Sequence, residues 1–132
     1  MKVAGFDYTR AQSVEHAQAL LESTGDEAKL IAGGQSLVPM MAMRLARPSH
    51  LIDINRLAEL KHFDIAANTV LMGATVSQSE IEDRAELLEA LPLVSQAIHW
   101  VGHRQTRNRG TLGGSLAPVS YTHLTLPTIL LV

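Results

Sequence analysis

Two pairs of adjacent glycines, each followed within two residues by a serine, constrain this chain more than any other feature. The first pair lies in Ala32-Gly33-Gly34-Gln35-Ser36-Leu37 and the second in Thr111-Leu112-Gly113-Gly114-Ser115. Paired glycines let a backbone turn sharply and approach a ligand without an intervening side chain. Successive backbone N–H groups in such a turn form a concave anion site. The two loops together therefore predict a clamp on a diphosphate group.

Each loop also has a purely structural alternative. The first is consistent with a plain strand-to-helix turn, because a buried strand is expected at 28–32 and a helix at 37–45, with Ser36 as its N-cap. A helix N-terminus at this point would favour bound phosphate. The alternative for the second loop is a β-bulge or a hairpin. The expected helix would turn three side chains inward: Val38, Met41 and Leu45.

Four segments extend these loops into a longer pattern. They read AGGQSLVP at 32–39, RLARP at 44–48, HLIDI at 50–54 and RNRGTLGGSLA at 107–117. In this order and spacing they resemble the FAD-binding medium subunit of molybdenum hydroxylases, the family of carbon monoxide dehydrogenase and xanthine dehydrogenase. The resemblance runs from Met1 to Ala117. It implies an α+β, PCMH-type FAD-binding fold like that of vanillyl-alcohol oxidase, of which this chain is the N-terminal part only.

The resemblance also implies the site. FAD is the expected cofactor, and no catalytic residue and no metal ligand are expected, because the flavin does the redox chemistry while the protein positions it. Asn108 is expected as a cofactor contact, with a role in forming a turn as its alternative. The full set of expected cofactor contacts is Ala32, Gly33, Gly34, Gln35, Ser36, Leu37, Asn108, Thr111, Gly113 and Gly114.

The partners are implied by the same resemblance. A large subunit would carry the molybdenum cofactor and a small subunit two [2Fe–2S] clusters, whose electrons would pass through FAD to an acceptor. The alternative from a different functional class is a catalytically inert fragment that binds a nucleotide or phosphate. The substrate of the holoenzyme and the electron acceptor stay open.

The chain divides into three parts in this interpretation. Residues 1–54 are expected to form a first, βαβαβ-like FAD-binding subdomain, residues 55–117 the truncated start of a second, and residues 118–132 an artefactual tail. The run from Val119 to Thr128 is similar to the translation of a transposase sequencing adapter, which favours read-through. The alternative is a genuine hydrophobic C-terminal strand.

Local signals predict the elements of the first part. Ser13 is a good N-cap, Gly25 is expected to end the helix that follows it, and a second strand is expected at 51–54. The inward face of that helix is predicted to carry Val14, Ala17, Leu20 and Leu21.

In the second part, strands are expected at 63–66 and 70–73, paired around a tight turn at Ala67-Asn68. Ser77 and Glu80 match a capping box. A helix covers 79–82 or beyond, and a second runs to about Leu91. Residues 106–117 are expected to form a loop with a glycine turn, with a strand as a further option. Pro92 opens a third helix whose predicted inward residues are Leu93, Val94, Ala97, Ile98 and Val101.

Composition excludes several other classes. The formal net charge is −2, which argues against nucleic acid as a partner. The chain has no cysteine, so it holds no disulfide and no iron–sulfur cluster of its own. No apolar run reaches the length of a membrane span and no signal peptide is visible. We therefore expect a cytoplasmic protein.

Some polar residues permit two interpretations. Arg107 and Arg109 either neutralise phosphate charge or make salt bridges or partner contacts. His99 and His103 would share a helix face, and a surface or capping pair is favoured over a metal site. Asp53 ends a strand, where an acid binds ribose in Rossmann folds. Because no GxGxxG precedes it, a capping or turn carboxylate is favoured.

Overall fold

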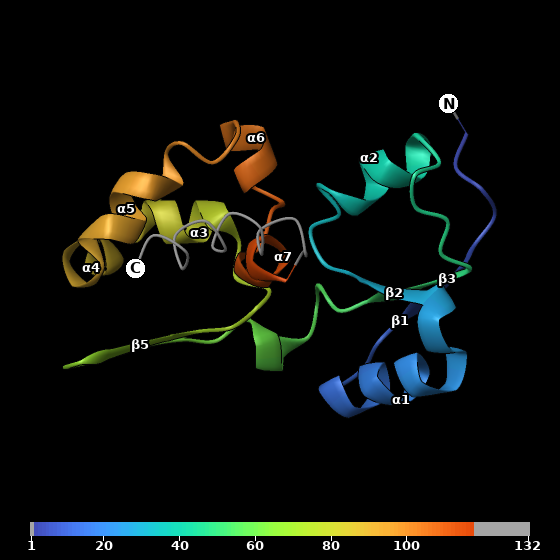
Figure 1. Cartoon of the computed structure of the whole chain (residues 1–132). Helices are drawn as coiled ribbons and strands as arrows, with labels where there is room; N and C mark the ends of the chain where they lie inside the picture. Colours follow the sequence, from blue (N-terminus) through green and yellow to red (C-terminus); the bar gives the residue numbers. More distant parts are fainter. Residues whose placement is uncertain (1, 118–132) are drawn as a thin grey trace, which may run out of the picture.

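A three-stranded parallel sheet organises the N-terminal half of the chain (Figure 1). The computed structural model describes residues 2–117. Strands β1 (Asp7–Arg10), β2 (Ala28–Ile31) and β3 (His50–Asp53) lie in the order β1-β3-β2, with β3 parallel to both neighbours. Helices α1 (Val14–Thr24) and α2 (Leu37–Ala42) connect them and lie on opposite sides of the sheet. The element order is βαβαβ, as predicted.

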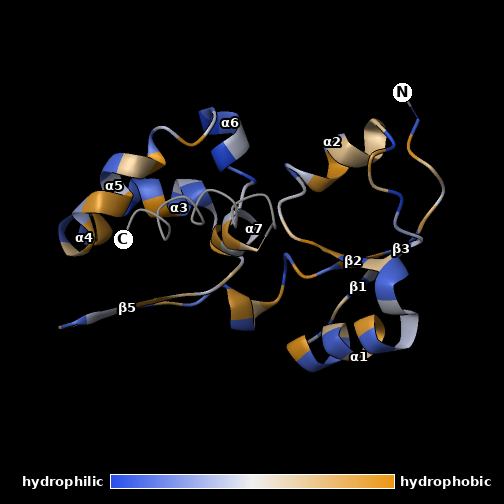
Figure 2. Ribbon diagram, in the orientation of Figure 1, coloured by the Kyte–Doolittle hydropathy of each residue, from blue (hydrophilic) through white to orange (hydrophobic). Residues whose placement is uncertain are grey.

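Helix α1 covers one face of this sheet and forms the first core. It begins as predicted, because Ser13 Oγ accepts a hydrogen bond of 3.1 Å from the His16 N–H. It ends at Gly25, whose φ of 69° lies in the left-handed region that glycine tolerates best. Figure 2 shows hydrophobic and hydrophilic residues alternating along it. The predicted inward face is confirmed, since Ala17 is buried and Val14, Leu20 and Leu21 pack against the same cluster.

Helix α2 differs from its prediction. It stops before Leu45, because Arg44 adopts a φ of 59° that no helix can continue. The break rotates Leu45 into solvent, and Val38 is also exposed, so of the three expected inward residues only Met41 is buried. Ser36 precedes the helix, but its side chain caps no backbone N–H. The capping role expected for Ser36 was therefore wrong.

The C-terminal half consists of a hairpin and short helices (Figure 1). Strands β4 (Phe63–Ala66) and β5 (Thr69–Met72) are antiparallel, with Ala66 paired to Thr69 around the predicted two-residue turn. Two 3₁₀ turns, η1 and η2, occur earlier in the chain. The remaining elements are η1 (Gly25–Glu27), η2 (Ala58–Leu60), α3 (Gln78–Asp83), α4 (Ala85–Ala90), α5 (Pro92–Ile98), α6 (Arg104–Arg107) and α7 (Leu112–Leu116).

The predicted start signals of α3 and α5 are confirmed. Ser77 and Glu80 form the reciprocal capping box, and Pro92 occupies the first turn of α5. The inward face of α5 is narrower than expected. Only Val94 and Ile98, four residues apart, join the second hydrophobic core, whereas Leu93 is 78% exposed. A helix of two turns buries one such stripe, and Ala97 and Val101 lie outside it.

The segment from 106 to 117 was expected to be a loop, yet it contains the end of α6 and all of α7. Thr111 is the N-cap of α7, and its Oγ1 accepts a 3.1 Å hydrogen bond from the Gly114 N–H. A Cβ on Gly113 would lie 2.8 Å from the Ala74 Cβ. Here glycine permits close packing of a helix rather than a turn, which is why the expectation failed.

The predicted artefactual tail, 118–132, lies outside the described residues. Within residues 2–117, no helix has the length and apolarity needed to cross a membrane.

Candidate functional site

The first glycine loop leaves β2 at the carboxyl edge of the parallel sheet, where ligands of open α/β sheets bind. Gly34 has a φ of 70°. Among residues 2–117, none of the six backbone N–H groups from Ala32 to Leu37 donates to a protein acceptor. A row of free backbone donors in a turn with a left-handed residue is the geometry of an anion-binding nest. The loop therefore has the donors that a phosphate group needs.

The two glycine loops meet at Gly33. A Cβ built on this residue would lie 1.9 Å from the Arg109 carbonyl oxygen and 3.1 Å from the Gly110 Cα. No side chain fits between these backbones, so the close approach requires glycine. The contact sets Arg109 beside the row of free N–H groups. The first loop therefore packs against residues 109–110 rather than against 113–114, and a clamp on a diphosphate stays a prediction.

The second glycine loop has no such free donors at its glycines. Each of its N–H groups near the glycines has a partner within the described chain, because the loop lies along the segment preceding α3. The backbone N–H of Leu112 donates to Val76 O at 2.9 Å, that of Gly113 to Ala74 O at 2.8 Å and that of Gly114 to Thr111 Oγ1 at 3.1 Å. The expectation that this loop also forms a backbone anion site was wrong, and its cofactor contacts stay a prediction.

Two pockets flank the first loop and share its residues 31–35. Pocket 1, of about 580 Å³, is completed by Tyr8, Asp53, Asn55 and Arg109 among others. Pocket 2, of about 500 Å³, extends to the start of α7. Of the predicted contacts, Asn108 and Gly113 line neither of these two pockets. The predicted contacts that do line one or both are Ala32, Gly33, Gly34, Gln35, Ser36, Leu37, Thr111 and Gly114.

A phenol and a carboxylate face each other in pocket 1. The Tyr8 hydroxyl donates to Asp53 Oδ2, and this hydrogen bond raises the pKa of the Tyr8 phenol. Asp53 Oδ1 accepts a 2.8 Å bond from the Asn55 N–H, which confirms the turn carboxylate favoured from the sequence. Sequence reasoning missed Tyr8 and Asn55, because nothing in the local pattern shows that β1 and β3 are neighbours.

Gln78 is a third residue that sequence reasoning missed. It is buried, it lines pocket 2, and its backbone N–H donates to Gly110 O at 2.8 Å. Its Nε2 donates to Ser115 Oγ at 2.7 Å, while its Oε1 is buried without a partner in the described chain. These contacts brace the second loop. The capping box around Ser77 marks the helix start but gives no sign of this role.

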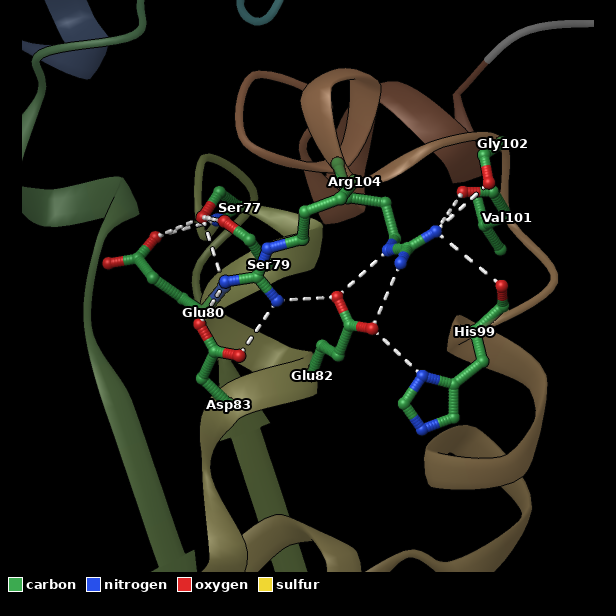
Figure 3. Close-up of polar contacts among 10 residues, drawn as sticks. Ser77, Ser79, Glu80, Glu82, Asp83, His99, Val101, Gly102 and Arg104 are labelled. Carbon is green, nitrogen blue, oxygen red and sulfur yellow. Dashed lines mark hydrogen bonds and ion pairs between the residues drawn. The ribbon is translucent and has the colours of Figure 1, made fainter.

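The structure decides between the alternatives for Arg107. Arg107 is buried and forks onto Glu82, with Nε to Oε2 at 2.8 Å and Nη2 to Oε1 at 3.0 Å (Figure 3). Its Nη1 also donates to the Gly102 carbonyl at 2.9 Å. Arg107 is therefore a structural ion-pair residue. Arg109 is exposed and lines pocket 1, and its role toward a phosphate stays a prediction.

Glu82 is the centre of this ion-pair network. Besides Arg107 it pairs with Arg104 at 2.7 Å and with His99 Nδ1 at 2.8 Å (Figure 3). His99 is thus a surface pair residue, as favoured from the sequence. Within residues 2–117, no group of three or more His, Asp or Glu is placed to hold a metal ion.

The network predicts an acid-sensitive contribution to stability. Hydrogen bonds from Arg107, then His99 and Arg104, hold the pKa of Glu82 at about 2, below its ordinary value. A lowered pKa means that the carboxylate stabilises the fold fully above its unfolded pKa and loses this contribution as the pH falls toward 2. We expect the stability gap between wild type and Glu82→Gln to shrink from pH 6 to pH 2 in urea unfolding. A gap that is constant with pH would contradict this.

A parallel βαβ sheet whose edge loop offers a row of free N–H groups beside an arginine defines a domain for phosphate-containing cofactors. The chain belongs to the family described as "FAD binding domain in molybdopterin dehydrogenase", whose model matches residues 4–132. Its cofactor is accordingly FAD. The region that matches the family model includes residues 118–132.

Curated relatives agree with this membership. The chain is 46% identical over 131 residues to the 6-hydroxypseudooxynicotine dehydrogenase complex subunit alpha of Paenarthrobacter nicotinovorans. The aligned region covers 99% of this chain and 44% of the relative. It is 44% identical over 112 residues to the carbon monoxide dehydrogenase medium chain of Hydrogenophaga pseudoflava, and this alignment covers 85% of this chain and 39% of the relative. The chain thus spans about two fifths of the length of these relatives.

Solved structures give the same result. Carbon monoxide dehydrogenase from Hydrogenophaga pseudoflava superposes with a TM-score of 0.86 at 43% identity, over 89% of this chain and 41% of that one. Quinoline 2-oxidoreductase from Pseudomonas putida 86 superposes with a TM-score of 0.84 at 36% identity, over 89% of this chain and 41% of that one. The mixed α/β fold of these FAD-binding subunits is therefore the fold of this chain.

Proposed function

We propose that this chain is part of the FAD-binding, electron-transfer medium subunit of a molybdenum hydroxylase. The observation that supports the proposal most is the row of free N–H groups from Ala32 to Leu37 beside Arg109. When bound, FAD would supply the electron-transfer chemistry between the [2Fe–2S] clusters of a partner subunit and an acceptor. The protein residues would bind and orient it.

The residues divide this task in our proposal. The N–H groups of Gly33, Gly34 and Gln35 would hold the diphosphate, and the Arg109 guanidinium would neutralise part of its charge. The Ser36 hydroxyl and Thr111 would form the near wall of pocket 2. Leu37, Asn108, Gly113 and Gly114 stay predicted contacts, together with Ala32. No side chain in this set is required to transfer a proton.

The partners belong to the same proposal. They are a large subunit with the molybdenum cofactor and a small subunit with [2Fe–2S] clusters, in a cytoplasmic complex. The relatives include subunits of a nicotine 6-hydroxylase, a caffeine dehydrogenase and a glyceraldehyde dehydrogenase. Such different substrates on similar medium chains favour a substrate site outside the part of the subunit described by this structure.

One observation favours a second candidate, a nucleotide-binding module without electron transfer. All the diphosphate donors of the first loop and Arg109 lie within residues 2–117. In this candidate these residues would bind the phosphates of a nucleotide without the partner subunits. Reduction of bound flavin by the two partner subunits would occur in the first candidate and not in the second.

Binding of FAD to the purified chain tests the proposal. We expect saturable binding of FAD, measured by the quenching of flavin fluorescence. We expect Arg109→Gln to bind FAD about tenfold more weakly, because a charge-assisted contact to phosphate is lost. Arg56→Gln is the matched control, since Arg56 is exposed and lies outside both pockets. If the wild-type chain binds no FAD, or if both variants weaken binding equally, the proposal fails.

A further inference from the structure

We propose that Asp53, oriented by Tyr8, binds the ribose hydroxyls of the adenosine half of the cofactor in pocket 1. This inference rests on the proposed FAD binding and extends it to one subsite. It assigns a ligand to a carboxylate for which the sequence favoured the role of a turn residue over ribose binding. The sheet and loop geometry provide the argument.

The position of Asp53 is the first step. It is the last residue of β3, the central strand, and it is half-buried at the carboxyl edge that also carries the glycine loop. The register pairs it with Ile31, the residue directly before that loop. A ligand held by the N–H groups of Gly33 and Gly34 therefore has Asp53 on the wall beside it.

The remaining hydrogen-bonding capacity of Asp53 is the second step. Its Oδ1 accepts from the Asn55 N–H and its Oδ2 from the Tyr8 hydroxyl. These two bonds fix the orientation of the carboxylate. A carboxylate has about four acceptor sites, so each oxygen can accept one more hydrogen bond. Asp53 is thus a preoriented acceptor that suits a ligand bearing O–H or N–H donors.

The distribution of charge across the pocket is the third step. The carboxylate of Asp53 repels phosphate, whereas Arg109 and the free N–H row attract it. A ligand that fits both walls has a phosphate joined closely to a group rich in hydroxyls. FAD has vicinal hydroxyls on both sides of its diphosphate, in the ribose of the adenosine half and in the ribityl chain of the flavin half.

The contrast with pocket 2 assigns the adenosine half rather than the flavin half. Pocket 1 presents a phenol, a carboxylate and an amide from Tyr8, Asp53 and Asn55. Pocket 2, on the other side of the same loop, includes the aliphatic residues Leu30, Ile31, Leu37 and Val101 in its lining. The ring system of a flavin is the more apolar end of the cofactor and suits the second surface better.

A comparison of ligands on the wild-type chain tests the inference without any substitution. The probes are FAD, ADP, FMN, and the 2′-deoxy and 3′-deoxy analogues of ADP, with dissociation constants measured by calorimetry. We expect ADP to bind about tenfold more tightly than at least one deoxy analogue, since a hydrogen bond to a charged acceptor is lost. Equal binding of all three ADP ligands would overturn the inference.

The variant Asp53→Asn provides the second arm. It keeps an oxygen for the Asn55 N–H but removes the charge, so we expect about tenfold weaker ADP and FAD binding, lost discrimination against the deoxy analogue, and unchanged FMN binding. Asp64→Asn is the matched control, because Asp64 is exposed on the hairpin and outside both pockets. Thermal unfolding checks that each variant is folded. If Asp53→Asn does not fold, the comparison of ligands on the wild-type chain alone tests the inference.

The outcomes separate this inference from the function on which it depends. If the wild-type chain binds FAD and Asp53→Asn binds ADP as tightly as wild type does, only the subsite is wrong. Equal weakening of FMN and ADP would show that Asp53 does not distinguish the two halves of the cofactor and would also overturn the inference. If the wild-type chain binds neither FAD nor ADP, both the proposed function and the subsite fail.

Discussion

Replacing Gly33 by alanine is expected to weaken FAD binding by about tenfold or more and to lower the thermal midpoint. The added Cβ would lie 1.9 Å from the Arg109 carbonyl oxygen, which is a backbone atom and cannot rotate away. The two loops must separate, at an overpacking cost of about 1–3 kcal/mol. Separation removes Arg109 from the free N–H groups. Fluorescence titration with FAD and thermal unfolding measure the two effects.

Gly5→Ala is the control for this change. A Cβ on Gly5 meets no atom within 4 Å, so the same substitution there adds a methyl group without a collision. We expect wild-type FAD affinity from it. If Gly33→Ala also retained wild-type affinity, the close approach of the two loops would not be needed for binding, and the description of the site as a clamp would be wrong.

The second large effect is expected from Arg107→Met, which should lower the free energy of unfolding by about 3 kcal/mol. The guanidinium is buried and satisfies Glu82 together with the carbonyls of Val101 and Gly102, at 3.2 and 2.9 Å. Methionine fills the space but removes this donor from the two carbonyls and from Glu82, which keeps only its more exposed partners Arg104 and His99. In a domain of this size, the change corresponds to a lowering of the thermal midpoint by at least about 10 °C.

Arg104→Met separates burial from charge in this prediction. Arg104 pairs with the same Glu82 and also with Asp83, but its side chain is 46% exposed where that of Arg107 is 10% exposed. Water can replace its hydrogen bonds, so we expect a small change in the unfolding midpoint. Equal destabilisation by the two variants would show that the charge of the network, and not the burial of Arg107, determines stability.

Signals that act over a few residues predicted the local structure well. Ser13, the Ser77–Glu80 capping box and the Ala67-Asn68 turn lie where the sequence placed them, because caps and tight turns depend on contacts within four residues. The βαβαβ order was predicted for the same reason. The first glycine loop was identified as a binding loop, and its free N–H groups support that interpretation.

Contacts between distant segments were not predictable in this way. Gly113 resembles a turn residue in the sequence, but its small size is required by Ala74. The partner of Arg107 is Glu82, and only the packing of α6 beside α3 brings the two together. The role of Gln78 depends on Ser115 in the same manner. Periodicity carries no information about which helix lies next to which.

The order of the strands also determines when the site can form during synthesis. Within the described chain, β1 and β2 each pair with β3, and not with one another. Both strands leave the ribosome before their common partner, so neither ladder can form until His50–Asp53 has emerged. The glycine loop then gains Arg109 later still. Although its glycines are made early, the loop meets Arg109 only after residue 109 has emerged, and nascent β2 has no partner strand until β3 follows it.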